Sequence, residues 1–590
     1  MAQLSPWPVF KAWSPNGEPL AYGLLTTYQA GTSIKQATFL DSTQTTQNSN
    51  PIRLDAFGQC ALWLDPTLSY KFVLTDSVGN TMPGYPVDNI QGPLSILYPQ
   101  TAAEIAAGIL PKNFSYPPLN VLRYGADPTG SADSTAAIQA ACAVANEGNG
   151  GRVYLPTGSY KVTSTITRQQ NVYIVGDGPG YDPGGSGFTS LVAVGNFPIV
   201  ASVGSASNVI NGGGVQNLVI NGTWGSNNAN TSSIGISESF TNRAIHRDVR
   251  IHGCYQGMYG IGIWQIIWDN VQVDGGGTQQ NNFGFYLDQL PTSFPSGTSN
   301  AVIATGCMAQ GVADTGFRLL NPNGSKFTAC EAENGNYGFF IGNTSSGMYP
   351  IEFAHFVNCL ADTCGIYGWV IQQGSNAVAC TYIQLANCWG SSCTSGFYID
   401  GCDQVNLTNL QVGNNSAGGI ILHNSQHCIV SNSELHANNT AANAGAGDIT
   451  ISGGSFNTII GNLSQNFNTA GKSLVESNGT DTNLIVHNAL FAGATLIGTH
   501  TRVIENPGYN PVGTSGPFTV GASPATITAG QSPETHYLTQ SATNTAVVSM
   551  NSLALGTLSA GTTLPIYLEP GQAYEVTWVT TAPTYQKDIH

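Results

Sequence analysis

The sequence predicts an all-β protein whose main part is a parallel β-helix, a solenoid made of strands and corners. Glycine accounts for 71 of the 590 residues, and only 8% of residues are charged, compared with about 25% in a typical soluble domain. No helical periodicity is evident from residue 181 onward. Instead, one pattern recurs roughly every 22 to 36 residues. A period of this size is typical of solenoids, in which each coil buries its core only against its neighbours.

Copies of the repeat follow one another in the middle of the chain. Four of them read GCMAQGVADTGFRLL (306–320), ACEAENGNYGFFI (329–341), NCLADTCGIYGWVI (358–371) and NCWGSSCTSGFYI (387–399). Each has a small residue between polar neighbours, a Gly or Asn turn, and a Gly-aromatic-x-aliphatic segment, as expected for short strands joined by corners. Ankyrin or tetratricopeptide arrays would need amphipathic helices, which this stretch lacks.

Four segments are predicted in order along the chain. Residues 1–93 read as short strands joined by Gly and Asn turns. Residues 94–119 read as a linker that includes a short helix within TAAEIAAGIL (101–110). Residues 120–505 form the predicted β-helix, and residues 506–590 alternate apolar and polar side chains, as in a small β-sandwich. We expect this last segment to lock a trimer or to contact a glycan.

A longer helix is predicted where the β-helix segment begins. Asp133 or Ser134 can cap its N-terminus. The apolar residues that then recur at helical spacing are Ala137, Ile138, Ala141, Cys142 and Ala145. We expect this helix to cap the first coil.

The charge balance excludes several classes of partner. The chain has 17 Lys and Arg against 33 Asp and Glu, a formal net charge of −16. Because nucleic acids and anionic membranes are bound by clustered Lys and Arg, we predict no nucleic-acid binding and no membrane insertion. No apolar run reaches the ~18 residues of a membrane span. The N-terminal MAQLSPWPVFKAW lacks the pattern of a secretory signal, so we expect synthesis in a bacterial-type cytoplasm.

The twelve cysteines are expected to be reduced thiols in that compartment. No CxxC and no His/Cys spacing suited to zinc occurs, so we expect no metal and no other cofactor. Cys307, Cys330, Cys359 and Cys388 share one repeat position. They are predicted to form an inward ladder of thiols that pack as small apolar groups, with stacked disulfides as the alternative.

Three stretches resemble parts of phage tail proteins. NVLRYGADPTGSADSTAAIQAACAVA and GGRVYLPTGSYKV, within 120–162, resemble the opening of the pectate lyase-like β-helix of phage tailspikes. In the first block, YQAGTSIKQATFLDSTQTT and NPIRLDAFGQCALWL resemble the particle-attachment end of phage tail fibres. NPGYNPVG (506–513) resembles the exit from such a helix into a C-terminal β module.

The resemblance implies a right-handed β-helix, a homotrimer located in the virion tail, and a bacterial surface polysaccharide as substrate. It also implies attachment to the phage baseplate or to another tail protein through the N-terminal domain. The sequence departs from two relatives of this fold. The GHG motif of galacturonan hydrolases is absent, and so is the Asp cluster with paired Arg that marks calcium-dependent pectate lyases.

Alternation along each strand separates inward from outward residues. In CEAEN, Cys330 and Ala332 are predicted to face inward, and Glu331 and Glu333 outward. The aligned inner position holds Ile220, Ile251, Val273, Ala309, Ala332, Ala361, Gly390, Val412 and Leu435. The outward column through Glu333 holds Asn221, His252, Asp274, Gln310, Glu333, Asp362, Ser391, Gly413 and His436. The column through Glu331 holds Val219, Arg250, Gln272, Met308, Glu331, Leu360, Trp389, Gln411 and Glu434.

Asp274, Glu331, Glu333 and Asp362 therefore gather on one outer face. Adjacent strands lie ~4.8 Å apart, and the diagonal from Glu331 to Asp362 spans roughly 7–8 Å. Glycoside hydrolysis uses two carboxyls ~5–5.5 Å apart when retaining and ~6.5–9.5 Å apart when inverting. Like charges this close raise one pKa and make a general acid available. We predict Glu333 and Asp362 as the catalytic pair, one as acid and the other as base or nucleophile, with Glu331 as the substitute.

Other residues are predicted to contact the substrate. Trp389 is expected to stack on a sugar ring, and the remaining candidates are Asp274, Arg250, His252, Glu434 and His436. Arg250 either holds an acidic sugar or neutralises Asp274. Asp400 and His423, on adjacent coils, form a second and weaker acid–base candidate. A solvated face, calcium binding and subunit contact are the alternative roles of the carboxylates.

These observations lead us to expect a tailspike that binds and depolymerises a capsule, exopolysaccharide or lipopolysaccharide chain by glycoside hydrolysis. One alternative is a lyase that acts by β-elimination on a uronate-containing glycan, for which Arg250, His252 or His436 would matter more. A non-enzymatic adhesin fibre and a structural particle protein are the others. An unsaturated, ultraviolet-absorbing product identifies a lyase, and unchanged polymer length identifies an adhesin.

Overall fold

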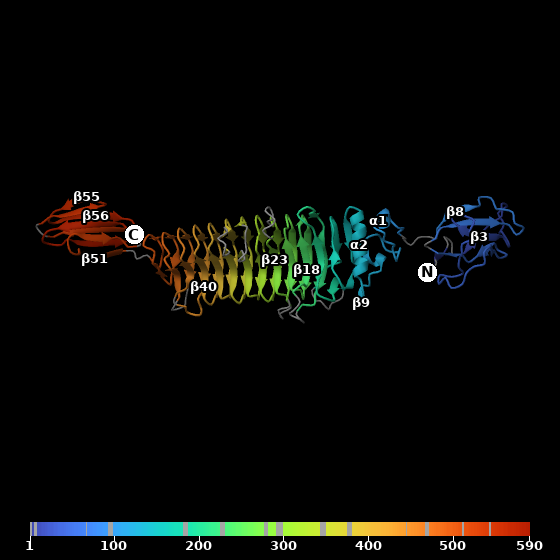
Figure 1. Ribbon diagram of the computed structural model, residues 1–590, viewed down its shortest axis with the longest axis horizontal. Coiled ribbons are helices and arrows are strands. Elements are labelled where there is room, and N and C mark those ends of the chain that lie inside the picture. The colour runs from blue at the N-terminus through green and yellow to red at the C-terminus, as the bar shows by residue number, and fades with distance from the viewer. Residues whose placement is uncertain are drawn as a thin grey trace. The chain divides into compact units, whose positions relative to one another are not determined.

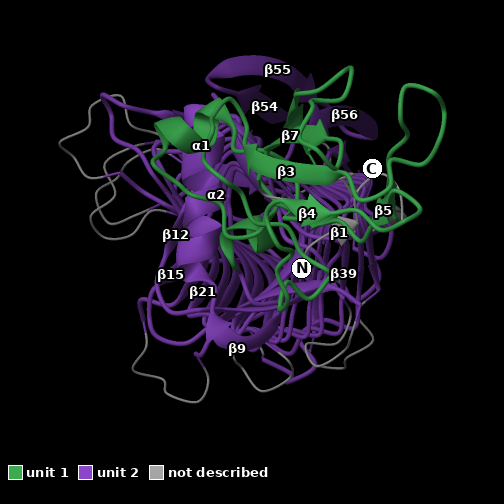
Figure 2. Ribbon diagram, turned by 90° about the vertical axis from the view of Figure 1, so that its right-hand side faces the viewer, with its two compact units in different colours: residues 1–125 green, residues 126–590 purple. Residues whose placement is uncertain are grey.

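The computed structural model describes residues 3–4, 9–65, 68–91, 98–180, 187–224, 231–275, 281–290, 299–342, 350–373, 380–443, 445–465, 471–509, 513–530, 532–541 and 544–589. The chain divides into two compact units, residues 1–125 and residues 126–590 (Figure 2). Residues 510–512 of the NPGYNPVG motif lie outside the described residues.

The first unit contains a small antiparallel sheet. Its four strands, in sheet order, are β4 (Ile52–Arg53), β3 (Leu24–Gln29), β7 (Tyr70–Thr75) and β8 (Val87–Ile90). Two further pairs are β1 (Gln3–Leu4) with β6 (Trp63–Leu64) and β2 (Phe10–Lys11) with β5 (Gln59–Cys60). Burial alternates along β7, so that Tyr70, Phe72 and Leu74 enter the core of the unit.

The short helix predicted within 101–110 is confirmed as α1 (Ala102–Ala106). Thr101 and Glu104 form a capping box at its start. Glu104 is fully buried and accepts hydrogen bonds from Arg123 Nη2 at 3.0 Å and from the Tyr124 hydroxyl at 2.9 Å. Both donors come from the 3-10 helix η1 (Val121–Tyr124), so this ion pair ties the linker segment together.

The second helix, α2 (Thr135–Glu147), begins where the sequence predicts it. Of the two predicted caps, Asp133 supplies the hydrogen bond, because its Oδ1 accepts from the backbone N–H of Thr135 at 3.0 Å. The predicted apolar positions are buried, and α2 packs against β10, β12 and β13 at the start of the helix. Among the described residues that follow Glu147 there is no further helix.

The rest of the second unit is dominated by two long parallel sheets, which have 25 and 13 strands within the described residues. In the middle of the unit a coil contributes two short strands to the larger sheet and one to the smaller sheet. Figure 1 shows the coils following one another from α2, in cyan, to β40, in orange. The fold class predicted from the sequence, a right-handed parallel β-helix with a capping helix, is confirmed.

The strands of the larger sheet, in chain order, are β9 (Thr129–Asp133), β10 (Gly151–Tyr154), β11 (Gly158–Val162), β13 (Val172–Val175), β14 (Thr189–Ala193), β17 (Gly214–Asn221), β20 (Ile245–His252), β22 (Ile267–Asp274), β24 (Ile303–Thr305), β25 (Met308–Gln310), β27 (Lys326–Thr328), β28 (Glu331–Glu333), β31 (His355–Val357), β32 (Leu360–Asp362), β35 (Gln384–Ala386), β36 (Trp389–Ser391), β38 (Asn406–Thr408), β39 (Gln411–Gly413), β41 (Ile429–Ser431), β42 (Glu434–His436), β44 (Thr458–Ile460), β45 (Leu463–Gln465), β47 (Leu484–Val486), β48 (Ala489–Leu490) and β50 (Arg502–Ile504).

The strands of the smaller sheet are β12 (Ile166–Thr167), β15 (Pro198–Val203), β18 (Ile234–Ser239), β21 (Gln256–Ile261), β23 (Phe283–Asp288), β26 (Thr315–Leu319), β29 (Tyr337–Gly342), β33 (Tyr367–Gln372), β37 (Ser395–Asp400), β40 (Gly418–His423), β43 (Gly447–Ser452), β46 (Lys472–Ser477) and β49 (Ala494–Thr495). Two short parallel pairs, β16 (Ile210–Asn211) with β19 (Thr241–Asn242) and β30 (Ile351–Glu352) with β34 (Cys380–Thr381), lie at corners.

The interior of the helix is a set of ladders that run from coil to coil. Five buried rings stack with centroids 4.5, 4.6, 3.9 and 5.8 Å apart; in order they are Phe285, Phe317, Phe339, Trp369 and Phe397. Cys307, Cys330, Cys359 and Cys388 are buried, and each thiol contacts a backbone carbonyl of the preceding coil at 3.4–3.6 Å. All twelve cysteines lie in the described residues and are free, which confirms the thiol ladder.

The C-terminal stretch is a β-sandwich, as its alternating pattern predicts. One antiparallel sheet contains β51 (Gly513–Thr519), β58 (Thr584–Ile589), β53 (Glu534–Gln540) and β56 (Thr562–Leu568). The other contains β52 (Ala525–Thr528), β57 (Ala573–Trp578), β54 (Ala546–Met550) and β55 (Leu553–Leu558). Leu538, Val548 and Tyr574 are among the residues of their shared core. Within the described residues, no helix is long and apolar enough to cross a membrane.

Candidate active site

The strand register places the predicted carboxylates on one outer face. Glu333 lies directly opposite Asp362, and Glu331 opposite Leu360, across the parallel pair β28–β32. The residue between the two glutamates, Ala332, pairs with Ala361, and both are buried. The columns derived from the sequence agree with the register of β17, β20, β22, β25, β28, β32, β36, β39 and β42. The outward prediction is wrong at Val219, Ser391 and Gly413, which are buried.

Glu331 and Glu333 share a hydrogen bond between their carboxyl groups. Two carboxyl oxygens can bond in this way only if one carboxyl carries a proton. This contact, together with partial burial and the charges of Glu333 and Asp362, raises the pKa of Glu331 to about 7. Glu331 therefore gains and loses its proton near neutral pH, which an ordinary glutamate does not.

Neighbouring groups hold the other two carboxyls in place. Gln310 Nε2 donates to Glu333 Oε2 at 3.0 Å from the preceding strand. The backbone N–H of Thr363 donates to Asp362 Oδ1 at 2.9 Å. Sequence reasoning placed Gln310 in the correct column but gave it no role, because an amide is informative only once its contact with a carboxylate is known.

A separate group in the same outward columns contains Asp274, two strands before Glu333, with Arg250 and His252 one strand earlier. Arg250 Nη2 lies 3.2 Å from Asp274 Oδ2, and His252 Nδ1 lies 3.2 Å from the Asp274 carbonyl oxygen. Burial lowers the pKa of His252. Of the two predicted roles of Arg250, this geometry favours neutralisation of Asp274.

The strands of the larger sheet that follow those of the carboxylates carry Trp389, Glu434 and His436. Trp389 pairs with Leu360 on the next strand and is 39% exposed. Glu434 and Gln411 line a cavity of about 330 Å³ together with Asn387, Asn409 and Asn432. His436 is exposed on β42, three strands beyond Asp362. The structure thus aligns these residues with the carboxylates on one face but does not bring them into direct contact with them.

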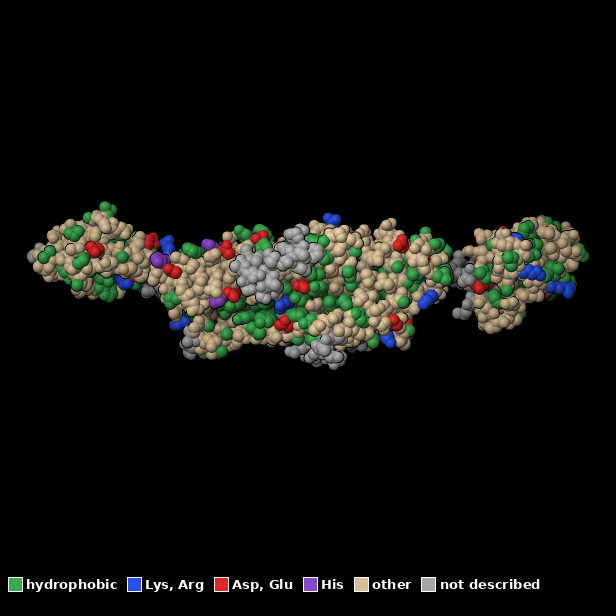
Figure 3. All heavy atoms as spheres, viewed as in Figure 1, with side chains coloured by type: hydrophobic (Ala, Val, Ile, Leu, Met, Phe, Trp, Pro, Cys, Tyr) green, Lys and Arg blue, Asp and Glu red, His purple; other side chains and the backbone are tan. Residues whose placement is uncertain are grey.

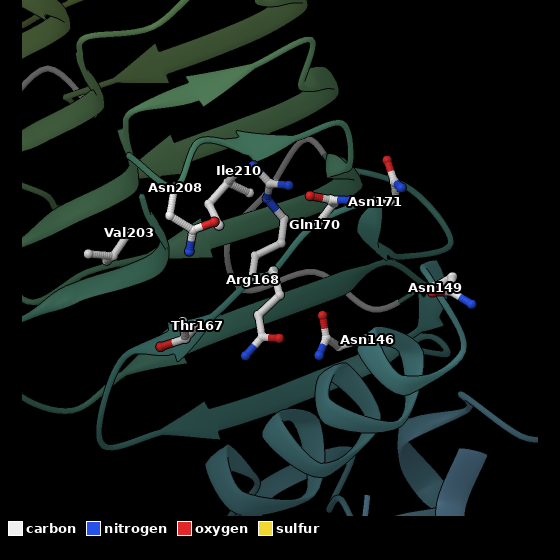
Figure 4. A pocket seen from close by; sticks show the side chains of 10 residues that line it. Asn146, Asn149, Thr167, Arg168, Gln170, Asn171, Val203, Asn208 and Ile210 are labelled. Atoms are coloured by element: carbon white, nitrogen blue, oxygen red, sulfur yellow. The ribbon is translucent and has the colours of Figure 1, made fainter. Parts of the chain in front are cut away.

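A larger cavity, of about 480 Å³, lies near the end of α2. Figure 4 shows Asn146, Thr167, Asn171 and Asn208 around it, with Arg168 among them. Arg168 is fully buried, and its Nη2 lies 2.8 Å from Glu238 Oε2. None of Glu331, Glu333 and Asp362 lines this cavity. It is larger than the cavity beside Glu434, but it does not contain the candidate catalytic residues.

The second acid–base candidate is a close contact on the smaller sheet. His423 Nδ1 lies 2.7 Å from Asp400 Oδ1, and the Tyr398 hydroxyl lies 3.4 Å from each of these side chains. The tyrosine was not a candidate at the sequence level. In the described residues, no group of three or more His, Cys, Asp or Glu side chains is arranged to hold a metal ion.

Permanent cations are scarce around the carboxylates, and the nearest in sequence is Lys326, on β27 five residues before Glu331. No Lys or Arg occurs between Lys326 and Lys472, whereas this stretch contains Glu331, Glu333, Glu352, Asp362, Asp400, Asp403, Glu434 and Asp448. The face drawn in Figure 3 likewise carries only scattered charged side chains. A polyanionic ligand would therefore meet net repulsion on these coils.

Comparison with known proteins identifies the opening of the helix. Residues 119–184 match the family model described as rhamnogalacturonase A/epimerase, pectate lyase-like. This match confirms the resemblance predicted from residues 120–162. It ends well before the first carboxylate of the candidate site.

Curated relatives match a similarly short stretch. The mannuronan C5-epimerase AlgE3 of Azotobacter vinelandii is 47% identical over 68 residues, which is 10% of this chain and 4% of the relative. Alginate lyase 7 of the same organism is 44% identical over 68 residues, which is 10% of this chain and 8% of the relative. The matches span less than a tenth of the length of these relatives.

Similar solved structures cover more of the chain at lower identity. The A-module of the A. vinelandii mannuronan C-5 epimerase AlgE6 is 20% identical, with a TM-score of 0.48 over 66% of this chain and 99% of that one. The Dettilon tailspike protein is 12% identical, with a TM-score of 0.46 over 79% of this chain and 92% of that one. Phage tailspikes are therefore among the structures to which this chain is similar.

Proposed function

We propose that this protein binds a polysaccharide along its β-helix and cleaves it by glycoside hydrolysis. The observation that carries the proposal is the cluster of Glu331 and Glu333 on β28 with Asp362 on the adjacent β32, in which the pKa of Glu331 is raised to about 7. An acid with a pKa near 7 beside a second carboxylate is the arrangement that glycosidases use. The local matches to polysaccharide-modifying enzymes support a polysaccharide as the substrate.

The geometry suggests a role for each carboxyl. Glu331 and Glu333 are within hydrogen-bonding distance of each other, which is too close to flank a glycosidic bond. The diagonal from Glu331 to Asp362, roughly 7–8 Å by strand geometry, matches the ~6.5–9.5 Å of inverting enzymes. We therefore assign Glu331 as the acid and Asp362 as the base, in place of the Glu333–Asp362 pair favoured by the sequence. Glu333 becomes a positioning residue that holds the proton on Glu331.

The reaction then follows in one step. Glu331 donates its proton to the glycosidic oxygen, which leaves as the hydroxyl of one product. Asp362 accepts a proton from a water molecule whose oxygen attacks the anomeric carbon from the opposite face of the sugar ring. The product has an inverted anomeric centre.

The test is incubation with purified bacterial surface polysaccharides, followed by mass analysis and anomeric NMR of the products. We expect shortened saturated chains of inverted configuration. Glu331→Gln and Asp362→Asn should each lower kcat about 10²–10⁴-fold, whereas Glu505→Gln, a matched change at an exposed glutamate outside the candidate site, should not. Wild-type turnover in both site variants would exclude this assignment.

A second candidate is a polysaccharide lyase, which the local match to alginate lyase 7 favours. A lyase would release an unsaturated product that absorbs in the ultraviolet. The absence of Lys and Arg between Lys326 and Lys472 favours hydrolysis, because β-elimination needs a group that neutralises the uronate carboxylate.

The biological setting is also a proposal. The resemblance of residues 1–93 to the attachment end of tail fibres supports a homotrimer mounted in a phage tail, with residues 120–505 as the glycan-processing part and residues 506–590 as the trimerising or glycan-contacting part. Light scattering tests the trimer, and a monomer would contradict it.

A further inference from the structure

One corner of the β-helix carries exposed aromatic rings in an unfavourable backbone conformation. Phe353, Tyr382 and Phe456 have φ angles of 59°, 56° and 58°, in the left-handed region. Their side chains are 53%, 44% and 56% exposed. A positive φ is a clear outlier for bulky residues, and their exposure to water adds a second cost. Strained residues that persist in this way point to a function.

These residues occupy one column that runs along the helix axis. Their preceding residues pair in parallel from coil to coil, in the order Glu352, Thr381, Asp403, Gln426, Ser455 and Asp481. On the four preceding coils the corresponding positions hold Arg243, Gln265, Ala301 and Gly324. From Glu352 onward the corner column contains Phe353, Tyr382, Gln404, His427, Phe456 and Thr482, all with φ between 52° and 59°. We call this column the aromatic corner.

The rings of the aromatic corner are aligned in two stacked pairs. Phe353 and Tyr382 stack with centroids 5.1 Å apart and planes at 3°. His427 and Phe456 stack with centroids 5.5 Å apart and planes at 14°. Gln404 lies between the pairs and is exposed. His427 Nδ1 is 2.7 Å from Asp403 Oδ1, which fixes the orientation of its ring.

Another corner of the same helix shows what a purely structural column looks like. There the left-handed positions of four successive coils are Asn358, Asn387, Asn409 and Asn432, a residue type that tolerates this conformation. Asn409 Nδ2 donates to Asn387 Oδ1 at 2.6 Å, and Asn387 Nδ2 to Asn358 Oδ1 at 3.1 Å. Asparagine thus satisfies the corner geometry through an amide ladder, so the geometry does not account for Phe353, Tyr382 and Phe456.

We infer that the aromatic corner is a second, non-catalytic binding line for a neutral polysaccharide chain lying along the helix axis. The C–H face of a pyranose ring packs on aromatic rings, and Gln404 and Asp403 supply groups that can bond its hydroxyls. The corner is one residue wide, whereas a stable protein interface buries about 800 Å² on each partner. A thin linear ligand therefore fits it better than a second copy of the chain.

Charge restricts the ligand further. The aromatic corner from Phe353 to Phe456 lies entirely within the stretch between Lys326 and Lys472 that has no Lys or Arg, and it is flanked by Glu352 and Asp403. The exposed Lys326, whose strand partner His355 follows Phe353 by two residues, stands at one end of the corner; beyond it a uronate or phosphate-bearing chain would meet no Lys or Arg as far as Phe456. The inference shares with the proposed function the premise of a polysaccharide ligand, but it does not depend on which carboxyls act.

The test uses the full-length Glu331→Gln protein, which should bind polysaccharide without cleaving it. Its retention is measured on purified bacterial surface polysaccharides, sorted into neutral and uronate-containing chains. Alginate serves as a defined uronate probe. The triple variant Phe353→Asn, Tyr382→Asn and Phe456→Asn removes the rings and supplies a residue that suits the backbone. Ala301→Asn is the control, because Ala301 has a φ of 55° at a left-handed corner position and carries no ring.

We expect retention on neutral chains only, and at least about tenfold weaker retention by the triple variant, with a Tm equal to or above that of the parent. Ala301→Asn should bind as the parent does. The inference would be overturned if the triple variant were retained as strongly as the parent, or if the parent were retained equally on uronate chains. It would also be overturned if the triple variant had a lower Tm or a changed oligomeric state in light scattering. If the wild-type protein depolymerises the chains but the triple variant is retained as strongly as the parent, only the aromatic corner is refuted. If every carboxyl variant depolymerises the chains as the wild type does, only the proposed function is refuted.

Discussion

Glu333→Gln tests whether the raised pKa of Glu331 is what equips the site for acid catalysis. The hydrogen bond that protonated Glu331 donates to Glu333 is the largest cause of the shift, and the Glu333 charge also contributes. The glutamine keeps the size of the side chain and removes its charge. Burial and the charge of Asp362 remain, so the pKa of Glu331 should fall part of the way toward its usual 4.5.

The size of the effect follows from the proton occupancy. At pH 7, a carboxyl with a pKa of about 4.5 carries a proton about 0.3% of the time, whereas one with a pKa of about 7 carries it about half the time. The coupling thus supplies roughly 150 times more of the acid form. If the pKa of Glu331 falls by about 1–2, kcat/KM should drop about 5–50-fold at pH 7 and by no more than about twofold at pH 5.

The assay is release of reducing ends from the depolymerised polysaccharide between pH 4.5 and 9. The wild-type rate should fall as the pH rises through about 7, where Glu331 loses its proton, and in Glu333→Gln this limb should move to lower pH. Glu505→Gln should leave the limb in place, because Glu505 is exposed and follows β50, several coils beyond the carboxylates. A uniformly lower rate with an unmoved limb would mean that Glu333 itself reacts with substrate, and an unchanged profile would refute the carboxyl pair.

Three further changes probe the rest of the molecule. Trp389→Ala should raise KM about tenfold with little change in kcat, because a stacking side chain contributes equally to ground and transition states; a fall in kcat alone would contradict this role. Glu104→Ala should lower the free energy of unfolding by about 3–5 kcal/mol, since it leaves Arg123 buried without its carboxylate. The pKa of Glu104 is lowered to about 2, so in the wild type this stabilisation should be complete above about pH 4.5 and be lost as the pH falls toward 2; urea titrations at pH 7 and pH 3 measure both effects. A thiol reagent should label the native protein negligibly, because eleven cysteines are buried and burial raises the pKa of Cys60 to about 12. Once the protein is unfolded, the reagent should label all twelve cysteines. Rapid labelling of the folded protein would argue against the packed ladder.

The sequence predicts the coils well because strand alternation and corner residues are local signals. Once Ala332 and Ala361 are recognised as one inward column, the positions of Glu333 and Asp362 on the outer face follow directly. The roles of the carboxyls depend on side-chain conformations instead. The contact between Glu331 and Glu333 links residues on a single strand. It makes Glu331 the preferred acid, whereas the spacing between strands favoured Glu333 and Asp362 as the catalytic pair.

The aromatic corner escaped the sequence analysis for a related reason. Phe353 and Tyr382 follow strand segments of only two residues, β30 and β34, and lie at a corner rather than in the Gly-aromatic segment that defines the repeat. Their significance depends on a backbone angle, which a single sequence does not reveal. An alignment of corner positions, rather than of strand positions, would have found the column.

The separation of inward and outward columns gives this protein room to change what it recognises. Ala332, Ala361 and Gly390 fix how neighbouring coils stack, while Glu331, Glu333, Leu360, Asp362 and Trp389 beside them remain at least partly exposed. New specificities can therefore arise by exchanging outward side chains one coil at a time, at small cost to the scaffold. A library that varies only Met308, Leu360, Trp389 and Gln411 would sample many surface chemistries on a single preserved backbone.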